Sequence, residues 1–223
     1  MNADNHNSYL SSSTYRSPLK LSSVRIKFPE DFNKYKIEGV CEICIPNTMN
    51  INNPMSLFQT HNSDIMDYFG IDRTETLEFK PSATFNFKNK KIEANTRILV
   101  FYDESDENYS KWRNYKYWNL NSKEYNSLEK YHKDLVENDF ARTGDILKWW
   151  FPTEIIKING NSCIKYSYIY SNSSFSDQNI AKSVYIFNGL KGVVKITTSF
   201  VVSEKKIWKE NFELALSTFS FKY

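Results

Sequence analysis

The chain has 223 residues, of which 40% are hydrophobic and 16% aromatic, and it carries a formal net charge of +3. This length accommodates one domain with an appendage and a sizeable buried core. Lys and Arg are spread along the chain, whereas a protein dedicated to duplex nucleic acid usually has a concentrated basic stripe, so we expect no such partner. The three cysteines are too few, and odd in number, for a disulfide framework.

The sequence contains no apolar run long enough to span a bilayer, and its first residues lack the apolar stretch of a secretory signal. We therefore expect no transmembrane segment and a cytoplasmic location, or an exported protein if a signal once preceded Met1. Residues 1–28 are rich in Ser and Asn and show no periodicity, which predicts an N-terminal tail. Residues 29–223 are predicted to form a single domain.

The first half of this domain predicts mostly strands. The stretch YKIEGVCEICIPNTMNI, which starts at Tyr35, predicts one strand that Pro46-Asn47 ends. A short helix or turn is expected at 63–71. Further strands are expected at 76–80, 83–89 and 96–104.

A helix is predicted over 120–140, where Asn121 and Glu124 form a capping-box pattern. Its apolar face is predicted to carry Tyr125, Leu128, His132 and Leu135.

The second half predicts two hairpins and a final helix. The hairpin turns are indicated by Asn159-Gly160-Asn161 and by a loop from Asn188 to Gly192 with two glycines. The final helix is predicted to start at Ser203 as its N-cap, and a short strand follows at 219–223. Its buried face is expected to carry Trp208, Phe212, Ala215 and Phe219. Hairpins separated by helices favour an α+β fold, in which helices pack on a mostly antiparallel sheet.

Residues 164–222 contain the stretches YSYIY and VYIFNGLKGVVKITTSFVVSEKKIWKENFELALSTFSF, and an earlier strand reads CEICIPNTM. These segments resemble the PsbP/Mog-type superfamily, in element order over residues 36–223. The resemblance implies a three-layer α/β/α sandwich with a mostly antiparallel central sheet, in a bacterial protein. It also implies binding rather than chemistry, because members include a photosystem extrinsic protein, a Ran-GTPase-binding factor, bacterial lipoproteins and chaperones for secreted toxins. The resemblance transfers no partner-contact residue to this chain.

The aromatic residues of KWWFP admit two interpretations: an exposed ledge that binds a partner or an apolar ligand, or a strand inside the core. Because side chains alternate along a strand, Trp149 and Phe151 share one face and Trp150 takes the other. In a sheet covered on both sides all three would be buried, and we favour this interpretation. The following strand is predicted to place four residues on one face: Ile164, Tyr166, Tyr168 and Tyr170.

The cysteine and histidine positions do not favour a metal or redox site. Cys41 and Cys44 have C-x-x-C spacing, but residues three apart in a strand point to opposite faces. We therefore expect both, like Cys163, to be buried structural thiols. The histidines, His6, His61 and His132, lack metal-site spacing. His132 is expected to be half-buried on its helix rather than catalytic.

The acidic residues between Asp103 and Glu107 offer oxygen ligands for a weak calcium site. They lack the glycine and the ligand spacing of a calcium loop, so a solvated loop is the favoured interpretation. No phosphate-binding loop, nucleophile elbow or dinucleotide motif is present. We accordingly predict no catalytic residue, no cofactor and no metal.

The segment KWRNYKYWN, which starts at Lys111, is the strongest candidate for a functional surface. Aromatic faces beside cations suit single-stranded nucleic acid, an acidic peptide or a protein-binding hot spot. The alternative, which we favour, is a loop whose aromatic rings cover a sheet edge while its basic groups reach water. The candidate partner-binding residues are Trp112, Arg113, Tyr115, Tyr117 and Trp118.

Three functions fit these observations. The favoured one is a non-catalytic module that binds a protein partner, such as an adaptor, chaperone or immunity protein. The alternative is a carrier of a small ligand or lipid, with Tyr and Trp lining a cavity. The third is an enzyme that combines the acidic cluster with His132. The sequence does not specify an oligomeric state.

Overall fold

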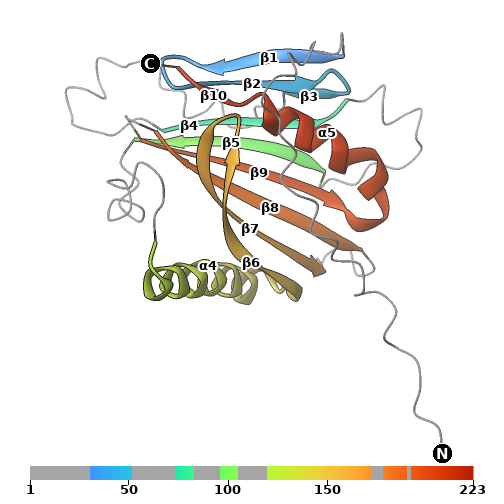
Figure 1. The fold of residues 1–223 in the computed structure, drawn as a ribbon. Coiled ribbons are helices and arrows are strands. Elements are labelled where there is room, and N and C mark those ends of the chain that lie inside the picture. The colour runs from blue at the N-terminus through green and yellow to red at the C-terminus, as the bar shows by residue number, and fades with distance from the viewer. Residues whose placement is uncertain are drawn as a thin grey trace, which may run out of the picture. The chain divides into compact units, whose positions relative to one another are not determined.

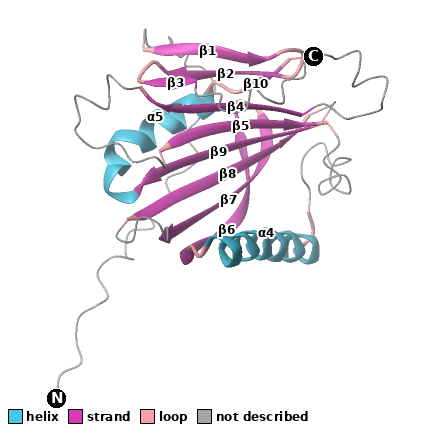
Figure 2. Cartoon of the chain, turned by 180° about the vertical axis from the view of Figure 1, so that it is seen from behind, coloured by secondary structure: helices cyan, strands magenta, loops and turns pink. Residues whose placement is uncertain are grey.

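The computed structural model describes residues 31–51, 74–82, 96–104, 120–171, 178–189 and 192–222. Within these ranges the protein is α+β, with two α-helices and antiparallel strand pairs (Figures 1 and 2). The predicted N-terminal tail, the predicted helix or turn at 63–71 and the predicted strand at 83–89 lie outside the described residues. Neither described helix is both long enough and apolar enough to cross a membrane.

The described strands form two sheets. The larger has the order β3-β4-β5-β9-β8-β7-β6, and every neighbouring pair in it is antiparallel. Its strands are β3 (Met49–Ile51), β4 (Thr74–Pro81), β5 (Arg97–Asp103), β6 (Ile146–Ile158), β7 (Asn161–Ser171), β8 (Asn179–Asn188) and β9 (Val193–Val201). The smaller sheet comprises β1 (Phe32–Ile37), β2 (Cys41–Pro46) and β10 (Ser220–Phe221).

The prediction of one continuous strand from residue 35 is wrong, because the chain turns back at Gly39, but its predicted end at Pro46 is confirmed by β2. Gly39 has φ 68°, a left-handed conformation that disfavours other residues. The backbone N–H of Val40 donates to the carbonyl of Ile37 at 3.0 Å, and β1 and β2 then pair as a hairpin. The hairpin turn predicted at Asn159-Gly160 is confirmed. Both residues have positive φ, and the turn joins β6 to β7.

Helix α4 (Ser122–Thr143) confirms the predicted capping box. The Asn121 side chain accepts from the backbone N–H of Glu124, and the Glu124 carboxylate accepts from the backbone N–H of Asn121. The buried face differs from the predicted one, because Leu135 is 44% exposed. The residues of α4 that are buried follow each other at a spacing of four: Leu128, His132, Val136 and Phe140.

Helix α5 (Lys205–Ser217) follows a short 3-10 turn, η2 (Val202–Glu204), which contains Ser203. The prediction of Ser203 as the N-cap is therefore wrong. Glu204 occupies the cap position, and its carboxylate accepts hydrogen bonds from the Trp208 indole at 2.8 Å and from the Thr96 hydroxyl at 3.0 Å. The predicted buried face is confirmed for Trp208, Phe212 and Ala215, whereas Phe219 is buried but lies beyond the end of the helix.

The described residues form two hydrophobic core clusters, one containing residues of α5 and the other residues of α4. Neighbouring residues of β8 belong to different clusters: Tyr185 and Phe187 pack with α5, whereas Val184 and Ile186 pack with α4. We call the corresponding faces of the large sheet the α5 side and the α4 side. The small sheet also packs into the α5 cluster, through residues such as Ile43 and Ile45 of β2.

Candidate functional site

The three aromatic residues of KWWFP alternate between the faces of β6, as predicted. Trp150 lies on the α4 side, with its ring stacked 5.5 Å from that of Tyr166. The prediction that all three are buried is wrong, because Trp149 is 58% exposed and Phe151 is 47% exposed on the opposite side. The tyrosines of β7 do lie in the α4 cluster, as predicted.

The exposure of Trp149 and Phe151 follows from the position of β6. This strand is last in the order of the large sheet, whereas α5 packs on β2 and β9 and leaves β6 uncovered. Both residues lie on the α5 side, where they pair with Ile169 and Ser167 of β7, and a register shift precedes Trp149 and another follows Phe151. Ile146 faces the same way and is 57% exposed. We call Ile146, Trp149 and Phe151 the β6 apolar row.

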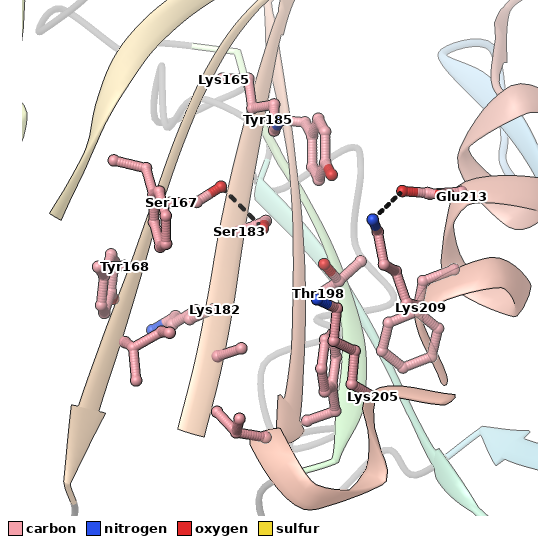
Figure 3. Close-up of a pocket in the computed structure, with 16 residues that line it drawn as sticks. Lys165, Ser167, Tyr168, Lys182, Ser183, Tyr185, Thr198, Lys205, Lys209 and Glu213 are labelled. Carbon is pink, nitrogen blue, oxygen red and sulfur yellow. Dashed lines mark hydrogen bonds and ion pairs between the residues drawn. The ribbon is translucent and has the colours of Figure 1, made fainter. Parts of the chain in front are cut away.

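The apolar row leads into a pocket of about 310 Å³ between the large sheet and α5 (Figure 3). Strands β7, β8 and β9 form its floor, η2 and the first turns of α5 form one wall, and Phe151 belongs to both the pocket and the row. The apolar side chains that line the pocket are Phe151, Ile169, Ala181, Phe200, Val202 and Phe212.

Hydroxyl groups occupy the floor of the pocket. Ser167 and Ser183 face each other on neighbouring strands, and the Ser167 hydroxyl donates to that of Ser183 at 2.8 Å (Figure 3). Burial raises the pKa of the Tyr185 hydroxyl, and a hydrogen bond with Ser183 opposes that shift. The phenol therefore stays protonated near neutral pH and can donate a hydrogen bond to a ligand.

Lysine side chains surround this floor. Lys165 of β7 lies 3.5 Å from Glu154, and Lys209 of α5 lies 3.7 Å from Glu213. Lys205 also lines the pocket and makes no ion pair with a described residue. Because both ion pairs are long and solvent-exposed, they neutralise these lysines only weakly. The pocket thus combines an apolar lining with excess positive charge.

The opposite face of β6 is anchored to α4 instead of being open. Glu129 accepts a hydrogen bond from the Trp150 indole and another from the backbone N–H of Thr153 at 2.6 Å. His132 stacks on Tyr166 with ring centroids 4.3 Å apart, and its Nδ1 lies 3.4 Å from the Thr153 hydroxyl. The expectation of a half-buried His132 is corrected, because its exposed fraction is 0%. Burial lowers the pKa of His132 to about 4, so the ring is neutral near pH 7.

The prediction of buried thiols is confirmed for all three cysteines. Burial raises the pKa of Cys41 and that of Cys163 to about 12, which suppresses the reactive thiolate. Cys44 is also buried, and its backbone N–H donates to the Thr218 hydroxyl at 2.7 Å. In the part of the chain that the structure describes, no three His, Cys, Asp or Glu side chains gather as metal ligands would.

Several predicted candidates cannot be placed. The five aromatic and basic residues between Trp112 and Trp118, as well as His6, His61, Asp106 and Glu107, lie outside the described residues. Asp103 ends β5, where it pairs with Val193 of β9. The pocket itself was missed by sequence reasoning, since its lining comes from four strands and a helix. The signal available in the sequence was the spacing of Lys205 and Lys209, which places both on one face of α5.

Comparison with known proteins supports the fold. No protein-family model and no curated protein sequence matches the chain. The structure is similar to cyanobacterial PsbP (CyanoP) from Synechocystis sp. PCC 6803, with a TM-score of 0.50 and 13% sequence identity over 90% of this chain and 98% of that chain. At this identity the similarity establishes the fold alone, and it confirms the PsbP-type fold expected from the sequence.

Two further structures match at lower similarity. PA94 from Pseudomonas aeruginosa, a protein of unknown function, gives a TM-score of 0.41 at 10% identity over 84% of this chain and 94% of that chain. LpqN of Mycobacterium tuberculosis, which is involved in cell envelope biogenesis, gives a TM-score of 0.38 at 8% identity over 86% of this chain and 91% of that chain.

Proposed function

We propose that this protein is a non-catalytic binding module that docks a protein partner on the α5 side of its large sheet, at the β6 apolar row. The observation that carries the proposal is the exposure of Ile146, Trp149 and Phe151 side by side on one face of an outer strand. Exposed apolar groups that are contiguous mark interaction surfaces, whereas isolated ones need no explanation. Tryptophan is also enriched among residues that dominate binding energy.

The geometry of the row supports a protein partner. The row continues through Phe151 into the pocket, so a flat apolar strip and a recess lie next to each other. Such a surface suits a segment that lies along β6 and inserts one side chain into the recess. Protein interfaces concentrate their binding energy in such central anchors.

The test is affinity purification of the partner from the native source, followed by titration of the purified partner with variants. Trp149→Ala combined with Phe151→Ala is expected to weaken the complex at least about 30-fold, because alanine replacement of an anchor typically costs about 2 kcal/mol or more. The matched control is Leu135→Ala, which removes a similarly exposed apolar group from α4. Equal affinity of the double variant and the wild type would exclude this face.

A second candidate function, a carrier of a small apolar ligand or lipid, is favoured by the pocket of about 310 Å³. This volume lies at the lower end of the range for small-molecule sites, about 300–1,000 Å³. Titration with a fatty acid, followed through the intrinsic fluorescence of the tryptophans, tests it. Saturable binding that Phe151→Ala abolishes would favour the carrier, provided that no protein partner competes.

The proposed absence of catalysis rests on the surroundings of the groups available for it. His132 lies in the α4 cluster among aromatic rings, and the pocket hydroxyls of Ser167 and Ser183 bond to each other. We propose in addition that α4, the large sheet and α5 form a three-layer α/β/α sandwich. The alternation of β8 side chains between the two clusters supports this arrangement.

A further inference from the structure

We propose that the segment docked on the α5 side is acidic, and that one of its carboxylates occupies the pocket between Lys165 and Lys205. This inference rests on the proposed function and adds the chemistry of the partner. It follows from the charges and donors of the pocket rather than from the apolar row.

The charged groups that face the pocket are mostly basic. Lys165 projects from β7, and Lys205 and Lys209 project from α5, whereas Glu213 is the acidic residue of the lining (Figure 3). Lys182 also borders the pocket, but its Nζ lies 5.8 Å from the centroid of the Tyr168 ring, which belongs to the α4 cluster. A carboxylate entering the pocket therefore meets lysines from both the sheet and α5.

The ion pairs already present leave this charge available. Lys209 and Glu213 belong to one exposed helix face, and Lys165 pairs with Glu154 near the outer edge of the sheet. Exposed pairs of this kind contribute about 0–1 kcal/mol, so a better-placed carboxylate can replace them at little cost. Lys205 has no described ion pair, so a bound carboxylate displaces no existing partner there.

The floor adds neutral donors to the lysines. The Tyr185 hydroxyl is buried and stays protonated, and the Ser183 hydroxyl lies beside it. A carboxylate accepts several hydrogen bonds at once, and bonds to an ionised acceptor are stronger than neutral ones. The apolar lining, including Phe200 and Phe212, fits an aliphatic or aromatic side chain next to the acid.

The occupant is a protein segment, because the apolar surface extends beyond the pocket. Trp149 and Ile146 are exposed but do not line the pocket, so a small anion that fills the pocket leaves them uncovered. A chain that lies along β6 covers them and still places an acidic residue between the lysines.

The experiment is a selection of random peptides displayed on phage against the full chain, with three variants tested in parallel. We expect the selected peptides to be enriched in Asp or Glu next to Leu, Phe or Trp. Lys165→Gln with Lys205→Gln is expected to weaken their binding at least about tenfold, because charged hydrogen bonds each contribute about 1.5–3 kcal/mol. The matched control Lys206→Gln, on the same helix but outside the lining, is expected to leave binding unchanged. Added salt is expected to weaken wild-type binding more than that of the double lysine variant.

The third variant, Trp149→Ala with Phe151→Ala, separates this inference from the proposed function. Selected peptides that need the aromatic residues but show no acidic enrichment and no lysine dependence would overturn the acidic inference and retain the docking face. Failure to select any peptide that depends on Trp149 and Phe151 would contradict both. Lysine-dependent binding of dodecanoate or of anionic phosphatidylglycerol vesicles, without binding of any peptide, would overturn the protein segment in favour of a free or membrane-bound anionic lipid.

Discussion

The two faces of β6 meet different surroundings, although their aromatic residues are neighbours in the chain. On the α4 side, Trp150 stacks on tyrosine rings and donates its indole N–H to Glu129. On the α5 side, Trp149 is more than half exposed, and no described helix or strand covers it. Because both residues are tryptophans, their difference in exposure comes from the element that covers each face and not from the type of side chain. One face stabilises the fold, and the other remains available for binding.

The largest expected effect is that of Trp150→Ala, which should lower the free energy of unfolding by about 3 kcal/mol, the lower end of the range for buried aromatic residues, because Trp150 is partly buried against the α4 cluster. Trp149→Ala should change it by no more than about 0.5 kcal/mol, as is usual for exposed positions. Urea denaturation measures both, and the midpoint should shift while the slope is unchanged. Equal losses for the two variants would mean that the two faces do not differ as described.

Glu129→Gln should have the next largest effect, a loss of about 2.5 kcal/mol, because the amide cannot accept both hydrogen bonds that the carboxylate accepts. The bonds concerned come from the Trp150 indole and the Thr153 backbone. Glu137→Gln provides the control on the same helix, since Glu137 is exposed and pairs only with Lys133 at 3.8 Å in the contacts described. Stability curves of the two variants that coincide would remove Glu129 as the anchor of α4.

The buried His132 predicts a pH dependence that belongs to the α4 side. Its pKa falls from 6.5 to about 4 on folding, so below pH 6.5 the unfolded chain binds a proton that the folded chain excludes. The stabilisation is complete above pH 6.5 and is lost as the pH falls toward 4, with a loss of about 2 kcal/mol by pH 5. Urea unfolding of the wild type and of His132→Gln at pH 7.5 and pH 5 isolates this contribution. A wild type that loses no more stability than the variant would show that His132 is accessible to protons in the fold.

Local patterns in the sequence predicted the features of the two faces that depend only on residues close together in the chain. Alternation assigned Trp149 and Trp150 to opposite faces, and the spacing of Asn121 and Glu124 predicted the start of α4; both are confirmed. Burial could not be predicted in this way, because it depends on which strand ends the sheet and on where α5 lies. Both are set by pairings between residues far apart in the chain.

The start of α5 and the pocket illustrate the same limit. Ser203 has the residue type of an N-cap, but Glu204 is held by Trp208 from the following turn and by Thr96 from the strand region before β5. The contact with Thr96 has no signal in the sequence near Ser203. Likewise, Ser167 and Ser183 meet only because β7 and β8 pair in one particular register.

The smallest expected effect on the free energy of unfolding comes from removing one hydroxyl on the α5 side, and it is compared with the removal of one hydroxyl on the α4 side. Ser167→Ala removes a hydrogen bond from the floor of the open pocket, where water can take the place of the lost partner, so the loss should stay below about 1 kcal/mol. Thr153→Val removes a hydroxyl that is fully buried beside His132 on the α4 side, and it should cost about 1–2 kcal/mol because water does not reach the site. Both are measured by urea unfolding at pH 7.5. A larger loss for Ser167→Ala than for Thr153→Val would mean that the pocket floor is closed to water and contributes to the core, which would leave the pocket no room for a carboxylate.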